Sequence, residues 1–147
     1  MKTDYTVPEN KNPLRSLYQL VDNNVKNYLA IAKRNSNSFI NNVNDKLWFN
    51  GNEAILNSVI GGVLNALVTH VRESHIQISA KELYGKMIEV NVKDDNCYNT
   101  YAVALSLQDI VPLAEKIGGR IDITNQRQKI TTVSFRFPLA NGQELSL

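Results

Sequence analysis

The stretch that decides the fold is VIGGVLNALVTHV, Val59 to Val71. Its apolar residues recur at intervals of three and four, as expected of a helix with one buried face. A single amide, Asn65, interrupts the apolar positions. The pattern predicts a helix over about residues 52 to 72, and it marks Asn65 as a candidate for a role beyond packing.

Upstream of this helix, the sequence predicts another helix and two short extended segments. Near-helical apolar spacing in PLRSLYQLVDNNVKNYLAIAKRN, with Pro13 suited to a first turn, predicts a long amphipathic helix over residues 13 to 34. SFINNV is typical of a strand, and LWFNGN is typical of a short apolar segment that ends in a turn at Gly51. We expect Trp48 and Phe49 to pack in the core.

Downstream of the helix, alternating apolar residues predict two hairpins. HIQISAK and MIEVNVK, joined by a turn at Gly85, form the first, and RIDITNQ and KITTVSFRFP form the second. Between the hairpins we expect a third helix over residues 102 to 117 that stops at Gly118-Gly119. Pro112 lies inside it, so either the helix kinks there or its regular part begins near Asp109 as an N-cap.

Together these elements predict an α+β fold in which about three helices cover one face of a mixed, mostly antiparallel sheet. Such a fold is a two-layer α/β sandwich. The chain of 147 residues suits one domain. We place this domain at residues 13 to 139, after an N-terminal tail or edge strand (1 to 12) and before a C-terminal tail (140 to 147).

The composition argues against several classes of protein. The net charge is +2, and the basic residues are scattered, which does not suit a nucleic-acid-binding protein. No apolar run is long enough to span a bilayer, and the first twelve residues lack the apolar middle of a secretory signal. The single Cys97 forms no internal disulfide. We therefore expect a cytoplasmic location and no membrane contact by this chain itself.

Two groups of ionisable residues are poor candidates for a site. His70 and His75 lie five residues apart without a third ligand, so a surface pair at a helix end is favoured over a metal site. Asp94 and Asp95 are adjacent, and in an extended segment they would point to opposite faces. This spacing argues against a paired acid-base site.

Three features follow one another along the chain: WFNGNEAILNSVIGGVLNAL, two strands ending in DDNCY, and a helix that closes at Gly-Gly before a hairpin. This order resembles the catalytic ATP-binding domain of sensor histidine kinases. The same superfamily holds gyrase, the large heat-shock chaperone and the mismatch-repair ATPase. The resemblance covers about residues 13 to 139 and implies the Bergerat-type ATPase fold.

The resemblance also implies a nucleotide site. Asn65 falls on the N-box position, whose side chain holds magnesium between the phosphates, and an amide oxygen suits that ion. Asp94 matches the acidic residue of the D-x-G-x-G motif, which accepts the adenine amine. Asn96 and Tyr98 stand where the two glycines of that motif belong. Thr131, in ITT, resembles the Gly-Thr pair near the end of the domain.

Other positions depart from the family pattern. The phosphate-holding G-L-G-L element is ALSL here, with the small residues Ala104 and Ser106 in place of the glycines. The cation three residues after the N-box Asn is Val68, and the polar residue one turn before it is Gly61. Only about five residues stand where active kinases carry a long lid. These losses imply an impaired or inactive enzyme that binds ATP and Mg²⁺ weakly or not at all.

The sequence thus predicts a degenerate histidine-kinase-type ATP-binding domain of a bacterial two-component signalling protein. One alternative is a nucleotide-independent docking or scaffold module for a response regulator or partner kinase. Another is a divergent anti-sigma-factor-type serine kinase, which has the same fold without a dimerising helical hairpin. For the first hypothesis, Asn65 is the predicted magnesium ligand. The predicted ligand-binding residues are Asn65, Asp94, Asn96, Ala104, Ser106 and Thr131.

Overall fold

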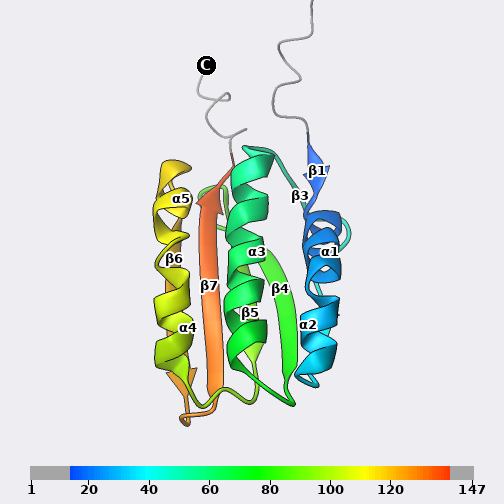
Figure 1. Ribbon diagram of the computed structural model, residues 1–147. Helices are drawn as coiled ribbons and strands as arrows, with labels where there is room; N and C mark the ends of the chain where they lie inside the picture. The colour runs from blue at the N-terminus through cyan, green and yellow to red at the C-terminus, as the bar shows by residue number, and fades with distance from the viewer. Residues whose placement is uncertain (1–13, 140–147) are drawn as a thin grey trace, which may run out of the picture.

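A five-stranded sheet forms one layer of the molecule (Figure 1). The computed structural model describes residues 14 to 139, so the two predicted tails lie outside the described residues. The strands, in their order across the sheet, are β2 (Ser38–Asn41), β4 (His75–Leu83), β5 (Met87–Asp94), β7 (Ile130–Pro138) and β6 (Arg120–Gln126). Only β2 and β4 pair in parallel, and the other three pairs are antiparallel. The predicted mixed, mostly antiparallel sheet is confirmed.

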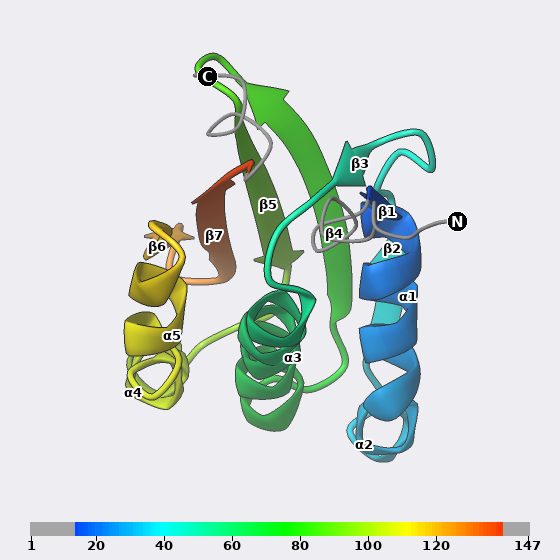
Figure 2. The ribbon, with the colours of Figure 1, turned by 90° about the horizontal axis from the view of Figure 1, so that it is seen from above.

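The helices form the second layer, on one face of the sheet (Figure 2). They are α1 (Leu17–Asn27), α2 (Leu29–Arg34), α3 (Glu53–His70), α4 (Thr100–Leu107) and α5 (Val111–Lys116). Seen from above, they stand in three columns: α1 with α2, α3 alone, and α4 with α5. The two-layer α+β sandwich is confirmed, and the three predicted helices correspond to these columns.

The first predicted helix, residues 13 to 34, is wrong in its start and its continuity. The strand β1 (Arg15–Ser16) precedes α1, and it pairs with β3 (Trp48–Phe49) in a small sheet. Ser16 then caps α1, because its Oγ accepts from the Gln19 amide at 3.1 Å. The column breaks at Tyr28, whose amide donates to the Val25 carbonyl and tightens the end of α1.

Trp48 and Phe49 have different environments, although both were predicted to be core residues. Phe49 is fully buried and makes an edge-to-face contact with Phe137 at 6.5 Å between ring centroids. Trp48 is 50% exposed, so that part of the prediction is wrong. Successive side chains of an extended segment point to opposite sides, so burying one leaves the other outside.

The helix predicted over residues 102 to 117 is two helices, α4 and α5. Pro112 lies in the first turn of α5, and Ile110 rather than Asp109 occupies its N-cap position. Ile110 also packs against α3 where that helix has Gly62. A Cβ placed on Gly62 would lie 2.6 Å from Ile110 Cγ2. The missing side chain at Gly62 therefore lets α3 approach the α4–α5 junction closely.

The core lies between the sheet and the helices. The inward-facing side chains of β4, including Ile76 and Ile78, are fully buried, and so are Leu64 and Leu67 of α3. Asn52 caps α3 by accepting from the Ile55 amide at 3.1 Å, close to the predicted start of that helix. Across residues 14 to 139, no helix combines the length and apolar character needed to cross a membrane.

Candidate functional site

The most unusual polar group of the described chain is the Asp94 carboxylate at the end of β5. Asp94 is fully buried, and its Oδ2 accepts from the Asn96 amide at 3.1 Å. Its Oδ1 is buried as well and accepts no hydrogen bond from the described residues. Burial raises the pKa of Asp94, and the nearby Ser74 hydroxyl and the Asn96 amide offset this only in part. The Ser74 hydroxyl donates its one hydrogen to Asn37 Oδ1, so Asp94 Oδ1 is left without a donor among the described residues.

Thr131 lies directly beside Asp94 in the sheet, because the two residues are paired between β5 and β7. Its buried hydroxyl is 3.2 Å from the Thr100 hydroxyl at the start of α4. Asn125 Nδ2 donates to both hydroxyls, at 2.8 Å for Thr100 and 3.0 Å for Thr131. The structure thus brings the predicted residues Asp94 and Thr131 together, and it adds Thr100 and Asn125 to their surroundings.

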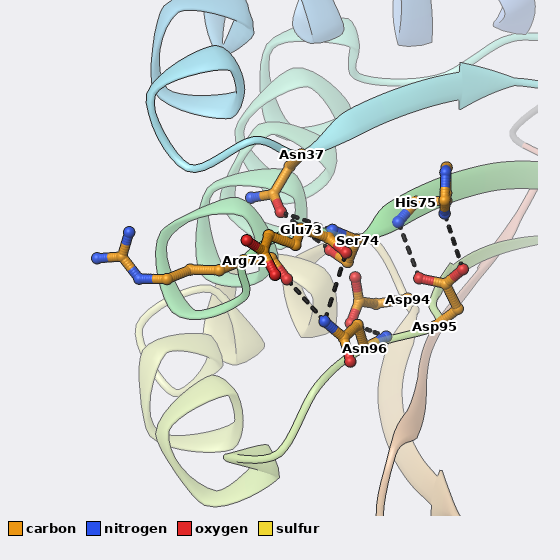
Figure 3. A network of polar contacts seen from close by, with 8 residues as sticks. All are labelled: Asn37, Arg72, Glu73, Ser74, His75, Asp94, Asp95 and Asn96. Atoms are coloured by element: carbon orange, nitrogen blue, oxygen red, sulfur yellow. Dashed lines mark hydrogen bonds and ion pairs between the residues drawn. The ribbon is translucent and has the colours of Figure 1, made fainter.

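Asn37 holds the end of α3 against the start of β4, and sequence reasoning missed it. Its Nδ2 donates to the carbonyls of Val68 at 3.3 Å and Val71 at 3.0 Å. Its Oδ1 accepts from the Ser74 amide at 3.2 Å and from the Ser74 hydroxyl at 3.0 Å (Figure 3). Asn37 lies in the polar turn NSNS, where no local pattern separates it from an ordinary exposed Asn.

Asp95 makes different contacts from its neighbour Asp94. Its two oxygens accept from the His75 amide at 2.8 Å and contact His75 Nδ1 at 2.9 Å (Figure 3). Partial burial raises the pKa of Asp95, but the hydrogen bonds from His75 outweigh it and lower the pKa overall. Asp94 is buried and Asp95 is exposed, which agrees with the prediction that the two side chains point to opposite faces.

A pocket of about 310 Å³ opens between the C-terminal end of α3 and the segment that joins β5 to α4. We call it the Asn96 pocket. Its lining residues are Thr69, His70, Val71, Arg72, Glu73, Asn96, Tyr98 and Asn99. Asn96 Nδ2 spans the space between the two segments and donates to the carbonyls of Arg72 at 2.9 Å and Glu73 at 3.4 Å. Asp94 is not part of the lining.

Asn65 lies on the exposed surface of α3, one helical turn before the pocket residue Thr69. The Thr69 hydroxyl donates to the Asn65 carbonyl at 2.6 Å and lies 3.3 Å from Asn65 Oδ1. Asn65 is not a lining residue of the Asn96 pocket, and Thr69 is the lining residue that it contacts. Within residues 14 to 139, no group of three or more His, Cys, Asp or Glu residues has a metal-binding arrangement. Asn65 is therefore a lone oxygen ligand at most.

Ala104 and Ser106 lie inside α4, not at its start. Their backbone N–H groups follow the first turn of the helix, so they donate within it. That position does not fit the phosphate contact predicted for them. The segment between β5 and α4 comprises residues 95 to 99, and Asn99 caps the helix by accepting from the Ala102 amide at 3.1 Å.

No protein-family model and no curated protein matches the chain, but solved structures do. The nucleotide-free catalytic domain of the histidine kinase ThkA aligns with a TM-score of 0.68 and 16% identity, over 88% of this chain and 96% of that domain. Acinetobacter baumannii histidine kinase AdeS aligns with a TM-score of 0.74 and 10% identity, over 92% of this chain and 74% of AdeS. The chain has the fold of a histidine kinase catalytic domain.

Two further structures with this fold carry a ligand or a partner. Full-length ShkA, in complex with AMPPNP, aligns with a TM-score of 0.77 and 14% identity, and this chain covers 31% of its length. ThkA has also been solved in complex with the response regulator TrrA. Because the identities are this low, the likeness establishes the histidine kinase fold alone. The chemistry of the site has to be argued from the residues of this chain.

Proposed function

We propose that this chain is a histidine-kinase-type ATP-binding domain of a bacterial two-component signalling protein in which nucleotide binding is weak or lost. One observation carries the proposal: the carboxylate of Asp94, which pairs with Thr131 in the sheet, is fully buried with an unpartnered oxygen, and it is hydrogen-bonded to Asn96, which lines the pocket. A buried polar atom without a partner costs free energy. An exocyclic amine, such as that of adenine, is a donor that would remove this cost.

We attribute the weak nucleotide binding to the residues that would surround the phosphates. Val68 is uncharged, and the amides of Ala104 and Ser106 are used within α4. The five residues between β5 and α4 are too few to fold over a triphosphate. Phosphoryl transfer depends on positioning and on charge neutralisation, so a site without these anchors is a poor kinase.

Magnesium fits this site only as a companion of the nucleotide. Mg²⁺ prefers six oxygen ligands and is commonly held by one or two protein groups together with phosphates and waters. Asn65 offers one amide oxygen, exposed and close to Thr69. We therefore assign Asn65 as the single protein ligand of the ion, which would depend on the phosphates for the rest of its shell.

Calorimetric titration tests the proposal, with adenosine, ADP and ATP each added with and without Mg²⁺. We expect a Kd of roughly 0.1 to 1 mM, which corresponds to a binding free energy of about −4 to −5.5 kcal/mol. The three ligands should bind with similar affinity, since phosphate anchors are missing, and Asp94→Asn should abolish binding. Submicromolar binding of ATP would contradict the proposal that nucleotide binding is weak. If none of the three ligands binds at millimolar concentrations, only the assignment of the fold remains.

A second candidate function is a docking module for a response regulator or partner kinase. Exposed apolar side chains support it: Tyr98 of the pocket lining is 74% exposed, and Tyr101 and Leu105 of α4 are 73% and 47% exposed. Tyr101 and Leu105 are one turn apart on α4, so they share a face of that helix. Exposed clusters of this kind often mark interaction sites.

Pull-down from the host with two variants separates the two functions. Asn65→Ala with Asp94→Ala removes the proposed ligand contacts, and Tyr101→Ser with Leu105→Ser removes the apolar face. If only the second pair abolishes capture of a response regulator, and added ATP has no effect, the docking function is favoured. If the first pair alone abolishes an ATP-dependent capture, the nucleotide-binding function is favoured.

A further inference from the structure

Asn96 stands where the histidine kinase motif has its first glycine, and here its side chain joins two segments. Its amide group donates to the carbonyls of Arg72 and Glu73, which lie in the turn between α3 and β4. Its backbone amide donates to Asp94 Oδ2 at 3.1 Å. In Figure 3, Asn96 lies beside Asp94 and directs its side chain toward that turn. One residue therefore holds both the carboxylate and the opposite wall of the pocket.

Asn96 and Asp94 differ in their access to the pocket. Asn96 lines the Asn96 pocket, whereas Asp94 is fully buried and does not. Tyr98, which also lines the pocket, is mostly exposed. Asn96 is thus a lining residue of the pocket that is also hydrogen-bonded to Asp94.

We propose that Asn96 is a latch that closes the Asn96 pocket over Asp94. In the closed state, its side chain bonds to the carbonyls of Arg72 and Glu73. A ligand reaches Asp94 only after these bonds break. Because the open state is the minor one, apparent affinity for a ligand of Asp94 is reduced by the fraction of molecules that are open. The identity of the ligand as an adenine nucleotide rests on the proposed function, whereas the latch itself does not.

The backbone conformation at Asn96 allows its side chain to be removed by substitution without added strain. Asn96 does not have a positive φ, so alanine there introduces no left-handed strain. Glu73, on the other wall, does have a positive φ, of 52°, and its amide donates to the Asn35 carbonyl at 3.0 Å. The turn that Asn96 holds is therefore a constrained one with its own anchor, and it should persist in Asn96→Ala.

Carboxyl footprinting measures access to Asp94 without any nucleotide. The full chain is treated with a carbodiimide and glycine ethyl ester, and labelling of individual residues is read by tandem mass spectrometry. Asp95, adjacent and exposed, serves as the internal reference. In the wild type, Asp94 should be labelled slowly, at a rate far below that of Asp95. In Asn96→Ala, labelling of Asp94 should rise by about tenfold, the change expected from losing one or two hydrogen bonds.

Asn41→Ala is the matched control. Asn41 also donates from Nδ2 to a backbone carbonyl, that of Tyr18 at 3.2 Å, but it lies in β2 outside the Asn96 pocket. Its replacement should leave the labelling of Asp94 unchanged. Asn96→Ser, whose side chain is too short to reach both carbonyls, replaces Asn96→Ala if the alanine variant does not fold by circular dichroism.

Nucleotide titration of the same variants separates the latch from the proposed function. Asn96→Ala should bind ADP about tenfold more tightly than the wild type, and adding Asp94→Asn should remove the gain. If Asp94 stays protected in a folded Asn96→Ala protein, the latch is overturned, whether or not ADP binds. If Asp94 becomes labelled but neither protein binds ADP, the latch stands and the proposed function fails.

Discussion

Two pockets of similar size lie at opposite ends of α3, and they differ in chemistry. The first, of about 330 Å³, lies at the Asn52 end, and we call it the Gly51 pocket. Its lining residues are Asn50, Gly51, Asn52, Leu56, Lys116, Ile117, Gly118, Phe137 and Pro138. The second is the Asn96 pocket, at the His70 end. The ionisable lining residue of the Gly51 pocket, Lys116, is exposed, whereas the Asn96 pocket lies beside a buried carboxylate.

This difference shows that the volume of a cavity does not identify a binding site. Ligand pockets combine concavity with a few well-placed polar groups whose ionisation is perturbed by their surroundings. Of the two pockets, the Asn96 pocket has such a group close by, because its lining residue Asn96 is hydrogen-bonded to Asp94, whose pKa is raised by burial. The Asn52 end is explained by the requirements of the fold, namely the N-cap of α3 and the packing of α5 against α3 and β6.

The largest effect on stability should come from Asn37, which supports the His70 end. Asn37→Ala removes four side-chain hydrogen bonds to the end of α3 and to Ser74. It should lower the free energy of unfolding by about 2 to 3 kcal/mol, since the buried groups it leaves have no new partners. Urea unfolding measures this. The control Asn23→Ala, on the exposed face of α1, should change stability by less than about 0.5 kcal/mol.

At neutral pH, Asp94→Asn should raise the free energy of unfolding, in contrast to Asn37→Ala, which lowers it. The folded state raises the pKa of Asp94 above its usual value of 3.8, so the folded protein binds this proton more tightly than the unfolded chain. Stability contributed by this group therefore falls as pH rises from about 3.8 through the folded pKa. Removing the charge should stabilise the protein by about 1 kcal/mol at pH 7 and by nothing below pH 3.8.

Thermal melts of the wild type and Asp94→Asn between pH 3.5 and pH 8 test this prediction, because other groups cancel in the comparison. A stabilised variant that no longer binds adenine nucleotides would mean that Asp94 is kept for function at a cost in stability. A variant destabilised by more than about 1 kcal/mol at pH 7 would instead make Asp94 a structural residue.

A smaller effect is expected at the Asn52 end. Asn52→Ala removes the N-cap of α3 and should cost about 1 kcal/mol, while Asn52→Asp, which keeps an acceptor, should remain close to the wild type. Neither variant should change the affinity for ADP. Chemical unfolding and calorimetry measure the two properties separately. A large loss of ADP affinity in either variant would indicate that the wrong end of α3 has been assigned.

The smallest effect should be that of Lys116→Ala. Lys116 is exposed at the end of α5 and lines the Gly51 pocket. Its removal should change stability by less than about 0.5 kcal/mol and leave nucleotide affinity as it is. A several-fold weakening of ATP binding, with adenosine unaffected, would show that the Gly51 pocket takes the phosphates.

The frame of the fold could be predicted from the sequence because its signals are local. Alternation in the two hairpins and the spacing of three and four in α3 each reflect one buried face, and they placed α3, β4, β5, β6 and β7 to within a few residues. The turn at Gly85 was predicted as well, and its φ of 88° accounts for the glycine. Such signals need no knowledge of distant contacts.

The remaining features depend on contacts between distant segments, which a single sequence does not display. The bonds from Asn37 to Ser74 and from Asn96 to Arg72 span long stretches of chain between residues of ordinary appearance. The break at Ile110 depends on how that residue packs against Gly62 of α3. For the candidate site, the motif match named Asp94, Asn96 and Thr131, while the hydrogen bonds from Asn96 to Arg72 and Glu73 could be seen only in the structure.

Chemical-shift mapping of ADP binding on the ¹⁵N-labelled protein tests most directly whether the His70 end is the nucleotide site. We expect the largest changes at the amides of Asp94 to Asn96, at Thr131 and in the turn from Val71 to Ser74, with none at Gly51 or Lys116. Changes centred on Gly51, Leu56 and Lys116, with Asp94 and Thr131 unaffected, would contradict this assignment.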